Sequence, residues 1–391
     1  GGTGGGAGGS NSAGTSLSTS DPNVVAITVD SGPATVSYID GAFASVTLCQ
    51  PGTTTCQTID HLLIDTGSTG VRVLESLVTL SLPAATSSSG GNLAECLPFL
   101  SGSSWGSVRM ADVKIGGETA SNMRIQLIGE STYALPNSCT GSPDNDLSTL
   151  QSNGILGIGL TAQDCGSACA ATGRNNPGLY YACTSKQSCT TVGVSTADQV
   201  ANPIASFAND NNGSFIQLPA IPAGGAPSVP GFLVFGIGTR SNNALGSANI
   251  IPVDNNGFCT TSYSGTSYGS FLDSGSNAYY FLDSTSSNIP TCTRGDWQGF
   301  YCPTTSTPFN ASILNKSGSP VAVTLMLANP STFSLQDSAF DDLGGPLDTG
   351  GQAQGLNASF DWGLPFFFGR TVFTAIEGKD TPGGTGPYFA F

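Results

Sequence analysis

Short apolar runs rich in Val, Ile, Thr and Phe follow one another from Val24 onward, and Gly, Pro, Asn and Ser separate them. Few stretches show the spacing of an amphipathic helix, so the pattern predicts a mainly β protein. Apolar and polar positions alternate over residues 34–39 and 43–49. A turn-rich segment then leads to an apolar run at 61–65, which ends in a Gly- and Ser-containing loop. This order predicts a strand, a hairpin, a second strand and a sharp loop.

Two lobes are expected from the length and from an interruption near the middle of the chain. At 391 residues each half could bury a core of its own. A Pro-, Gly- and Ala-rich segment at 218–231 is the best boundary. We therefore predict a flexible Gly/Ser-rich tether at residues 1–22, an N-terminal lobe at 23–220 and a C-terminal lobe at 221–391. Short helices are expected at 199–208 and 337–343, and the stretch 161–196 has the composition of a Cys-stapled insertion.

A weak internal repeat places one aspartate in each predicted lobe. The sequence LLIDTGST surrounds Asp65 and GSFLDSGSN surrounds Asp273, about half a chain apart. One such loop would be an ordinary turn, but two copies, each after an apolar strand, predict a duplicated lobe with facing carboxylates. Two adjacent carboxylates share one proton, so one can activate water while the other donates a proton to a carbonyl oxygen.

The residues after each aspartate suit such a pair. Small hydroxyl side chains can hydrogen-bond across it, glycine amides can approach the carboxylates, and serine hydroxyls can reach their outer oxygens. The predicted catalytic residues are Asp65 and Asp273, and the predicted supporting residues are Thr66, Gly67, Ser68, Ser274, Gly275 and Ser276.

The chain resembles the pepsin family of aspartic proteases from about Phe43 to Phe391. FASVTL…HLLIDTGSTGVRV is similar to the family's opening strands and first active-site loop, and NGILGIGL to the strand that braces this loop. GFLVFGIGTRSN and FDWGLPFFFGRTVFTAIEG resemble corresponding parts of the second lobe. The resemblance implies an all-β, bilobal double-barrel fold and an endopeptidase that binds extended polypeptide as an added strand, without metal or organic cofactor. A divergent bacterial secreted or lipoprotein branch is expected.

The resemblance also implies a flap hairpin, which departs from the family pattern. The family's flap Tyr falls on Phe99, its partner Trp falls on Arg72, and a bracing Gly is replaced by Pro365. We therefore expect a differently built flap, with Trp105 at its tip. The predicted flap and substrate-binding residues are Phe99, Ser101, Gly102, Trp105 and Arg72.

Composition points away from the cytosol and from nucleic acid. Charged residues make up only 9% of the chain, against roughly a quarter in ordinary soluble domains. The net charge of −15 repels nucleic acid and anionic membrane surfaces. Eleven cysteines in local groups indicate disulfides in an oxidising compartment, with Cys259 as the candidate left over. Zinc is the alternative for the groups at 165–169 and 183–189, although only His61 could add nitrogen.

More than one cellular location and more than one activity fit the sequence. No apolar run reaches the length of about 18 residues that suggests a membrane helix. The Gly/Ser-rich start is typical of the spacer after a lipidated Cys, so an outer-membrane lipoprotein or a secreted monomer is expected. The rivals to a protease are a catalytically silent pepsin-fold binding or inhibitory protein and a structural surface protein. A Ser or Cys triad would have to use His61, the single histidine.

The shortage of lysine predicts acid tolerance, because protonating the carboxylates leaves little positive charge to repel itself. The fold should remain intact on acidification, which circular dichroism between about pH 3 and pH 7 would measure. Unfolding below about pH 4 by a protein that is folded at pH 7 would contradict this prediction. The lysines are Lys114, Lys186, Lys316 and Lys379.

Overall fold

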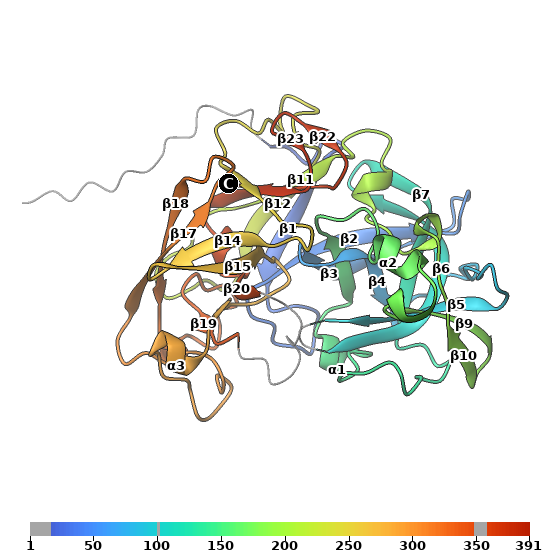
Figure 1. Cartoon of the computed structure of the whole chain (residues 1–391), viewed down its shortest axis with the longest axis horizontal. Helices are drawn as coiled ribbons and strands as arrows, with labels where there is room; N and C mark the ends of the chain where they lie inside the picture. The colour runs from blue at the N-terminus through green and yellow to red at the C-terminus, as the bar shows by residue number, and fades with distance from the viewer. Residues whose placement is uncertain (1–16, 100–101, 348–357) are drawn as a thin grey trace, which may run out of the picture.

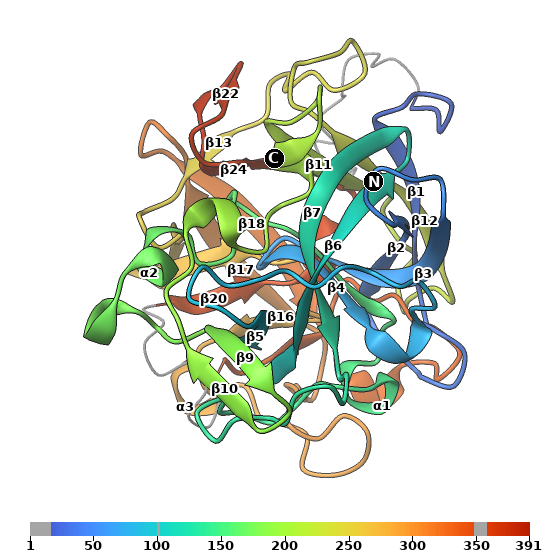
Figure 2. The same cartoon turned by 90° about the vertical axis from the view of Figure 1, so that its right-hand side faces the viewer.

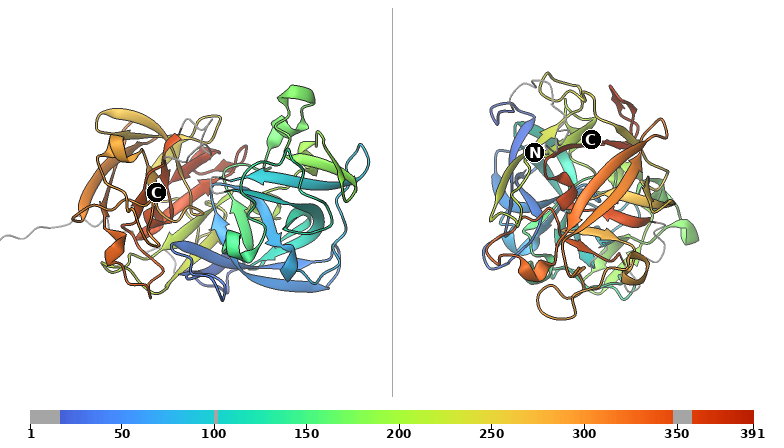
Figure 3. Two further views of the ribbon diagram at one scale, coloured as in Figure 1. Left: turned by 90° about the horizontal axis from the view of Figure 1, so that it is seen from below. Right: turned by 90° about the vertical axis from the view of Figure 1, so that its left-hand side faces the viewer.

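The computed structural model describes residues 17–99, 102–347 and 358–391. Blue to green strands lie on one side in Figure 1, yellow to red strands lie on the other, and β1, β11 and β12 lie between them. The view from below shows the same arrangement (Figure 3, left), and Figure 2 looks along the long axis with the blue and green strands in front. The described residues are almost all β-structure and form two barrel-like sheets, which confirms the predicted fold class.

Fifteen of the described strands make the larger sheet. Strand β6 pairs with both β7 and β2, so the strands from β2 through β3, β8, β4 and β7 to β6 close into a barrel. In sheet order the strands are β10 (Ser188–Thr191), β9 (Tyr180–Ser185), β5 (Asn92–Pro98), β6 (Ser103–Ile115), β7 (Glu118–Ile128), β4 (Thr69–Leu74), β8 (Gly154–Ile158), β3 (Cys56–Asp65), β2 (Gly41–Cys49), β1 (Val24–Asp30), β12 (Val229–Phe235), β11 (Gly213–Leu218), β21 (Arg370–Ala375), β24 (Tyr388–Ala390) and β13 (Ile250–Pro252).

Seven further described strands form the second sheet, and two form a small hairpin. Aromatic rings fill the core beneath the second sheet, where Phe281 lies 4.3 Å from Phe309 and 5.6 Å from Phe360 between ring centroids. The sheet order is β18 (Pro320–Leu327), β17 (Thr307–Leu314), β14 (Cys259–Tyr263), β15 (Thr266–Leu272), β20 (Ala358–Trp362), β16 (Tyr279–Phe281) and β19 (Gly344–Gly345), and the hairpin is β22 (Asp380–Thr381) with β23 (Gly384–Thr385).

Helices in the described chain are short. The α-helices are α1 (Leu147–Leu150), α2 (Gly166–Ala170) and α3 (Ser284–Ser287), and the 3₁₀ turns are η1 (Glu75–Leu77), η2 (Gly173–Asn175), η3 (Thr196–Asp198), η4 (Ile204–Ser206), η5 (Pro330–Thr332) and η6 (Leu364–Phe367). None of the helices in the described ranges has the length and apolar character needed to cross a membrane.

Three local predictions are wrong because backbone groups bind elsewhere. Residues 34–39 form a turn at 34–35 and then irregular backbone instead of a strand, with the Tyr38 amide donating to the Ser31 carbonyl at 2.8 Å. The segment 199–208 contains only η4, preceded by Pro203, which cannot donate a helical hydrogen bond. The segment 337–343 is not helical, since the Ala339 amide donates to the Ala226 carbonyl at 3.0 Å and the Phe340 amide to Asp40 Oδ1 at 2.7 Å.

Five disulfides staple the described chain, and Cys259 is the buried free cysteine, as expected. The cysteines considered for zinc are paired with each other, so they are not free to bind metal. The bonds are Cys49–Cys56, Cys96–Cys139, Cys165–Cys169, Cys183–Cys189 and Cys292–Cys302.

A cluster of three aspartates joins the loop before β2 to the segment before β19. Asp40 is fully buried, and its Oδ2 has no hydrogen-bond partner among the described residues. Burial and the carboxylates of Asp342 and Asp341 raise the pKa of Asp40 well above its ordinary value. Burial, with a smaller effect of Asp341, raises the pKa of Asp342 to about 6. The folded protein therefore binds protons at these sites that the unfolded chain would release.

We predict that the thermal unfolding midpoint falls as pH rises from about 4 to about 7, because folding must then bury carboxylates that unfolding would expose to water. A raised carboxyl pKa stabilises the fold most below the unfolded pKa of about 4, and this stabilisation is lost as pH rises through the folded pKa. Asp342→Asn should flatten this dependence, and the exposed control Asp296→Asn should not. Calorimetry across this range measures both, and identical slopes in the two variants would contradict the assignment.

Candidate active site

The two predicted aspartates meet where β3 and β15 end. Asp65 is the last residue of β3, and Asp273 directly follows β15. Each strand is buried where it approaches its aspartate, so the loops are held at fixed points of the two barrels. The two carboxyl groups lie next to each other, and the Asp65 carboxyl contributes to the raised pKa of Asp273, while 7% of Asp65 and 8% of Asp273 stay exposed. The pair is therefore nearly enclosed and still reachable by water.

Thr66 and Ser274 lock the two loops together by reciprocal hydrogen bonds. The Thr66 amide donates to Ser274 Oγ at 3.1 Å, and the Ser274 amide donates to Thr66 Oγ1 at 2.9 Å. Each hydroxyl also donates to a carbonyl of the opposite strand, Thr66 to Leu272 at 2.9 Å and Ser274 to Ile64 at 2.7 Å. All four bonds are buried, where a lost bond costs more than at the surface.

Glycine follows in both loops because the opposite carboxyl leaves no room for a side chain. A Cβ on Gly67 would lie 2.6 Å from Asp273 Cγ and Oδ2, and one on Gly275 would lie 2.7 Å from Asp65 Oδ1. Each glycine amide also donates to its own loop's aspartate Oδ1, at 2.8 Å for Gly67 and 2.7 Å for Gly275. The glycines thus allow the close approach and orient both carboxyls.

The outer oxygens of the pair are contacted by serine hydroxyls, with a difference between the two sides. Ser68 Oγ donates to Asp65 Oδ2, and Ser276 Oγ lies 3.1 Å from Asp273 Oδ2. Ser276 Oγ also lies 2.5 Å from Oδ2 of a third carboxyl, Asp361. Asp361 was not among the predicted site residues, although it is the single acidic residue in the apolar run SFDWGLPFFF.

Burial is the main electrostatic influence on the second aspartate. It raises the pKa of Asp273 well above the ordinary range, and the nearby Asp65 and Asp361 carboxyls raise it further. None of the ion pairs in the described part of the chain includes a carboxyl of this pair. A proton on Asp273 therefore takes the place of a counter-ion.

Segments beneath each loop hold its backbone. Under the first loop, β8 pairs Gly157 with Asp65, and the Gly159 amide donates to the Ser68 carbonyl at 2.8 Å. Under the second, the Asp273 amide donates to the Trp362 carbonyl at 3.1 Å and the Leu364 amide to the Ser276 carbonyl at 2.7 Å. Pro365, buried within η6, occupies a position that needs no amide donor at the start of the turn.

Three of the predicted flap residues, Phe99, Gly102 and Trp105, belong to the hairpin of β5 and β6. Phe99 is partly exposed at its turn, and its amide donates to the carbonyl of the buried Gly102 at 2.7 Å. Ser101 lies outside the described residues. The prediction that Trp105 occupies the tip is wrong. Trp105 pairs with Cys96 inside the hairpin and is 3% exposed. Its ring packs edge-on against Tyr181, and its Nε1 donates to the Tyr133 carbonyl at 3.1 Å.

Arg72, also expected at the flap, is fully buried beneath it and contacts the hairpin strand instead of the solvent face. Its Nη2 donates to Glu95 Oε1 on β5 at 2.9 Å and to Asp164 Oδ2 at 3.0 Å. Its Nη1 donates to the Thr69 carbonyl at 2.6 Å, and Tyr180 donates to Asp164. The network ties the strand after the first loop to the flap strand and to the segment stapled by Cys165–Cys169.

Charge balance in this network requires one proton. Burial, followed by the Glu95 charge, raises the pKa of Asp164 well above its ordinary value. A neutral Asp164 leaves one cation, Arg72, facing one anion, Glu95, with no net charge buried.

His61 makes its contacts with residues outside the Asp65–Asp273 pair. Its ring contacts Asp60 at 3.0 Å and Asp30 at 3.5 Å and tilts against Phe43. Across the described residues, no group of three or more His, Cys, Asp and Glu side chains is arranged to hold a metal ion.

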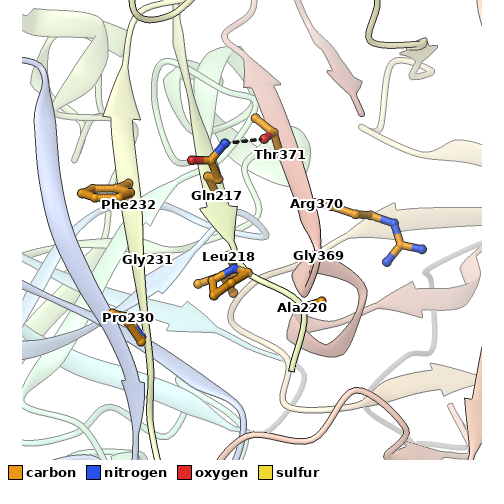
Figure 4. A pocket seen from close by; sticks show the side chains of 10 residues that line it. Gln217, Leu218, Ala220, Pro230, Gly231, Phe232, Gly369, Arg370 and Thr371 are labelled. Carbon is orange, nitrogen blue, oxygen red and sulfur yellow. Dashed lines mark hydrogen bonds between the residues drawn. The ribbon is translucent and has the colours of Figure 1, made fainter. Parts of the chain in front are cut away.

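A shallow pocket of about 490 Å³ lies at the ends of β11, β12 and β21 (Figure 4). Gln217 Nε2 donates to Thr371 Oγ1 at 3.0 Å along its wall, and Phe232 and Pro230 form the opposite side. Neither aspartate of the pair lines this pocket, so it is separate from the candidate site.

Comparisons with known proteins support the fold and assign no activity. A family model described as "Protein of unknown function (DUF3443)" matches residues 19–391. No curated protein is similar in sequence. The solved structures that match include the aspartic proteinase from Irpex lacteus, with a TM-score of 0.53 and 16% identity over 94% of this chain and 96% of that one. The pepsin-like architecture predicted from the motifs is therefore present.

We predict that Arg72→Met lowers the free energy of unfolding by about 3–5 kcal/mol, because it leaves buried carboxyls without their cation. Asp164→Asn should cost about 1 kcal/mol or less, since an amide imitates the neutral acid. Urea denaturation measures both, and Arg124→Met is the control, because the Arg124–Asp198 pair is partly exposed and worth about 1 kcal/mol or less. Equal losses in Arg72→Met and Arg124→Met would show that the network contributes little.

Proposed function

We propose that this chain, which belongs to the family described as proteins of unknown function (DUF3443), is an aspartic endopeptidase that hydrolyses extended polypeptides. The observation that carries the proposal is the Asp65–Asp273 pair, two adjacent carboxyls oriented by matching glycine amides. A turn needs one aspartate at most, and a purely structural pair would cost folding energy, because two carboxyls are buried without a cation. The same pepsin-like architecture occurs in the aspartic proteinase from Irpex lacteus.

The chemistry follows from one proton shared by two carboxyls. Burial raises the pKa of Asp273, which makes it the group that keeps the proton and donates it to the carbonyl oxygen of the scissile peptide. Asp65, whose outer oxygen accepts from Ser68, is the base that takes a proton from the attacking water. No covalent intermediate and no cofactor is required.

An extended polypeptide suits the surroundings of the pair. The β5–β6 hairpin brings the partly exposed ring of Phe99 to its turn, where the ring can cover an apolar side chain of the substrate. Main-chain hydrogen bonds from an added strand would supply affinity for many sequences. Because Phe99 has no hydroxyl, substrate is held there by apolar contact.

The proposed location is extracytoplasmic, either secreted or at the cell surface, with the protein acting as a monomer. Five disulfides in the described chain support this location, because such bonds persist in oxidising compartments. The net charge of −15 disfavours nucleic acid as a partner.

The test is cleavage of a denatured, carboxymethylated protein by the folded chain across about pH 3 to pH 7. Asp65→Asn and Asp273→Asn should each lower the rate by about 10²–10⁴-fold, because each removes one proton-transfer group. A pepstatin-type inhibitor should bind the wild type, and the exposed variant Asp296→Asn should cleave normally.

The rival is a pepsin-fold binding or inhibitory protein whose pair is silent. Folded wild type, checked by circular dichroism, that cleaves nothing at any pH would favour this rival. Cleavage that persists in both Asn variants would reject the pair as the active site.

A further inference from the structure

A third carboxyl belongs to the candidate site. Asp361 lies on β20, is 1% exposed, and shares the Ser276 hydroxyl with Asp273, at 2.5 Å from Asp361 Oδ2 and 3.1 Å from Asp273 Oδ2. On the other side of the site, Ser68 contacts Asp65. The two halves of the site therefore differ, although their loops are related by the internal repeat.

The contacts of Ser276 determine how many protons the three carboxyls hold. The serine hydroxyl has one proton, so it can donate to only one of its two carboxyl neighbours. The other contact is a hydrogen bond only if a carboxyl donates to Ser276 Oγ. Asp65 and Asp273 lie next to each other without an ion-pair partner among the described residues, and such a pair holds one proton between its carboxyls. Three carboxyls must then hold two protons, because one carboxyl proton cannot serve both the pair and Ser276.

Two distributions satisfy that count. In the first, Asp361 is neutral and donates to Ser276, Ser276 donates to Asp273 Oδ2, and the Asp65–Asp273 pair keeps one shared proton. In the second, Asp361 is ionised and both members of the pair are neutral, which leaves no carboxylate to activate water. Only the first distribution leaves the pair able to act as base and acid.

The surroundings of Asp361 favour its neutral form. Its Oδ1 is buried without a hydrogen-bond partner, and no ion pair in the described ranges includes it. A buried carboxylate with one unsatisfied oxygen is costly, and protonation removes most of that cost. Burial raises the pKa of Asp361 well above the ordinary value, with a further rise from Asp65.

The titratable groups that face Asp361 add no positive charge. They are Asp65 at the end of β3, Asp273 after β15, and Tyr280 on β16, which pairs with Asp361 in the sheet. The Tyr280 hydroxyl donates to Asn277 Oδ1 at 2.7 Å, so its proton is not available to Asp361. The proton on Asp361 therefore has no cationic substitute nearby.

We propose that Asp361 is a positioning residue that holds a proton and, through Ser276, directs a hydroxyl donor onto Asp273 Oδ2. Its catalytic consequence rests on the proposed function, whereas its protonation does not. The neutral acid fixes the Ser276 hydroxyl toward the pair and so stabilises the singly ionised pair. When Asp361 loses its proton, the hydroxyl turns to Asp361 and a negative charge appears beside the pair.

Infrared difference spectroscopy tests the proton without any assay of activity. The spectrum of wild type minus Asp361→Asn at about pH 6 should contain the carbonyl stretch of one protonated carboxylic acid, since exposed carboxyls are ionised there. Absence of that band would overturn the proposal whether or not the protein is a protease. Circular dichroism confirms that each variant is folded.

Coupling to the pair is tested by the acidic limb of the pH–kcat/KM profile. Asp361→Leu and Ser276→Ala should each move this limb upward by about one pH unit, because the singly ionised pair loses a hydrogen-bond donor. The double variant should shift no further than either single one, since both act through one hydroxyl. Asp361→Asn, whose amide donates to Ser276, should restore the limb that Asp361→Leu displaces.

If the acidic limbs of the pH–kcat/KM profiles coincide in wild type, Asp361→Leu and Ser276→Ala, Asp361 is not coupled to the pair. If the limb of Asp361→Asn shifts as far as that of Asp361→Leu, Asp361 does not act as a donor to Ser276. If Asp361→Leu does not fold, Ser276→Ala decides the first point. If the wild type cleaves nothing, the titration of the Asp273 carbonyl band, identified by its loss in Asp273→Asn, replaces the kinetic limb.

Discussion

The structure depends on two buried carboxyls that touch without a cation between them. Such contact is stable only if the pair holds a proton and the backbone keeps the groups from separating. The reciprocal bonds of Thr66 and Ser274 provide that restraint, and the absence of side chains at Gly67 and Gly275 permits the approach. The barrels on both sides serve to present these two loops at the ends of buried strands.

The molecule neutralises buried carboxyls in two ways. Beneath the flap, the Arg72 cation pairs with Glu95 and also contacts Asp164, whose pKa is raised by burial. At the candidate site and around Asp40, protons take the place of cations. With 26 acidic and 11 basic residues in the chain, protonation is the more available means. Stability and site chemistry therefore depend on pH through the same kind of group.

The likeness to the aspartic proteinase from Irpex lacteus is a likeness of fold at 16% identity. Two of the three positions where the sequence departs from the pepsin motifs, Phe99 and Arg72, lie at the β5–β6 hairpin and beneath it. An aromatic hydrogen-bonded pair is replaced by the apolar Phe99 above and by the ionic network of Arg72 below. The hairpin is consequently held from its base, by charge and by the packing of Trp105 against Tyr181.

The sequence by itself determined the β class, the paired loops around Asp65 and Asp273, and the unpaired Cys259, because these follow from local periodicity, short motifs and counting. Only the tertiary structure decided which groups far apart in the sequence form hydrogen bonds or pack against each other. The amide of Phe340 binds Asp40 instead of a helical carbonyl, Trp105 turns inward, and Asp361 reaches the pair through a serine. Each of these depends on hydrogen-bond partners or packing surfaces far away in the chain, which no local pattern of residues encodes.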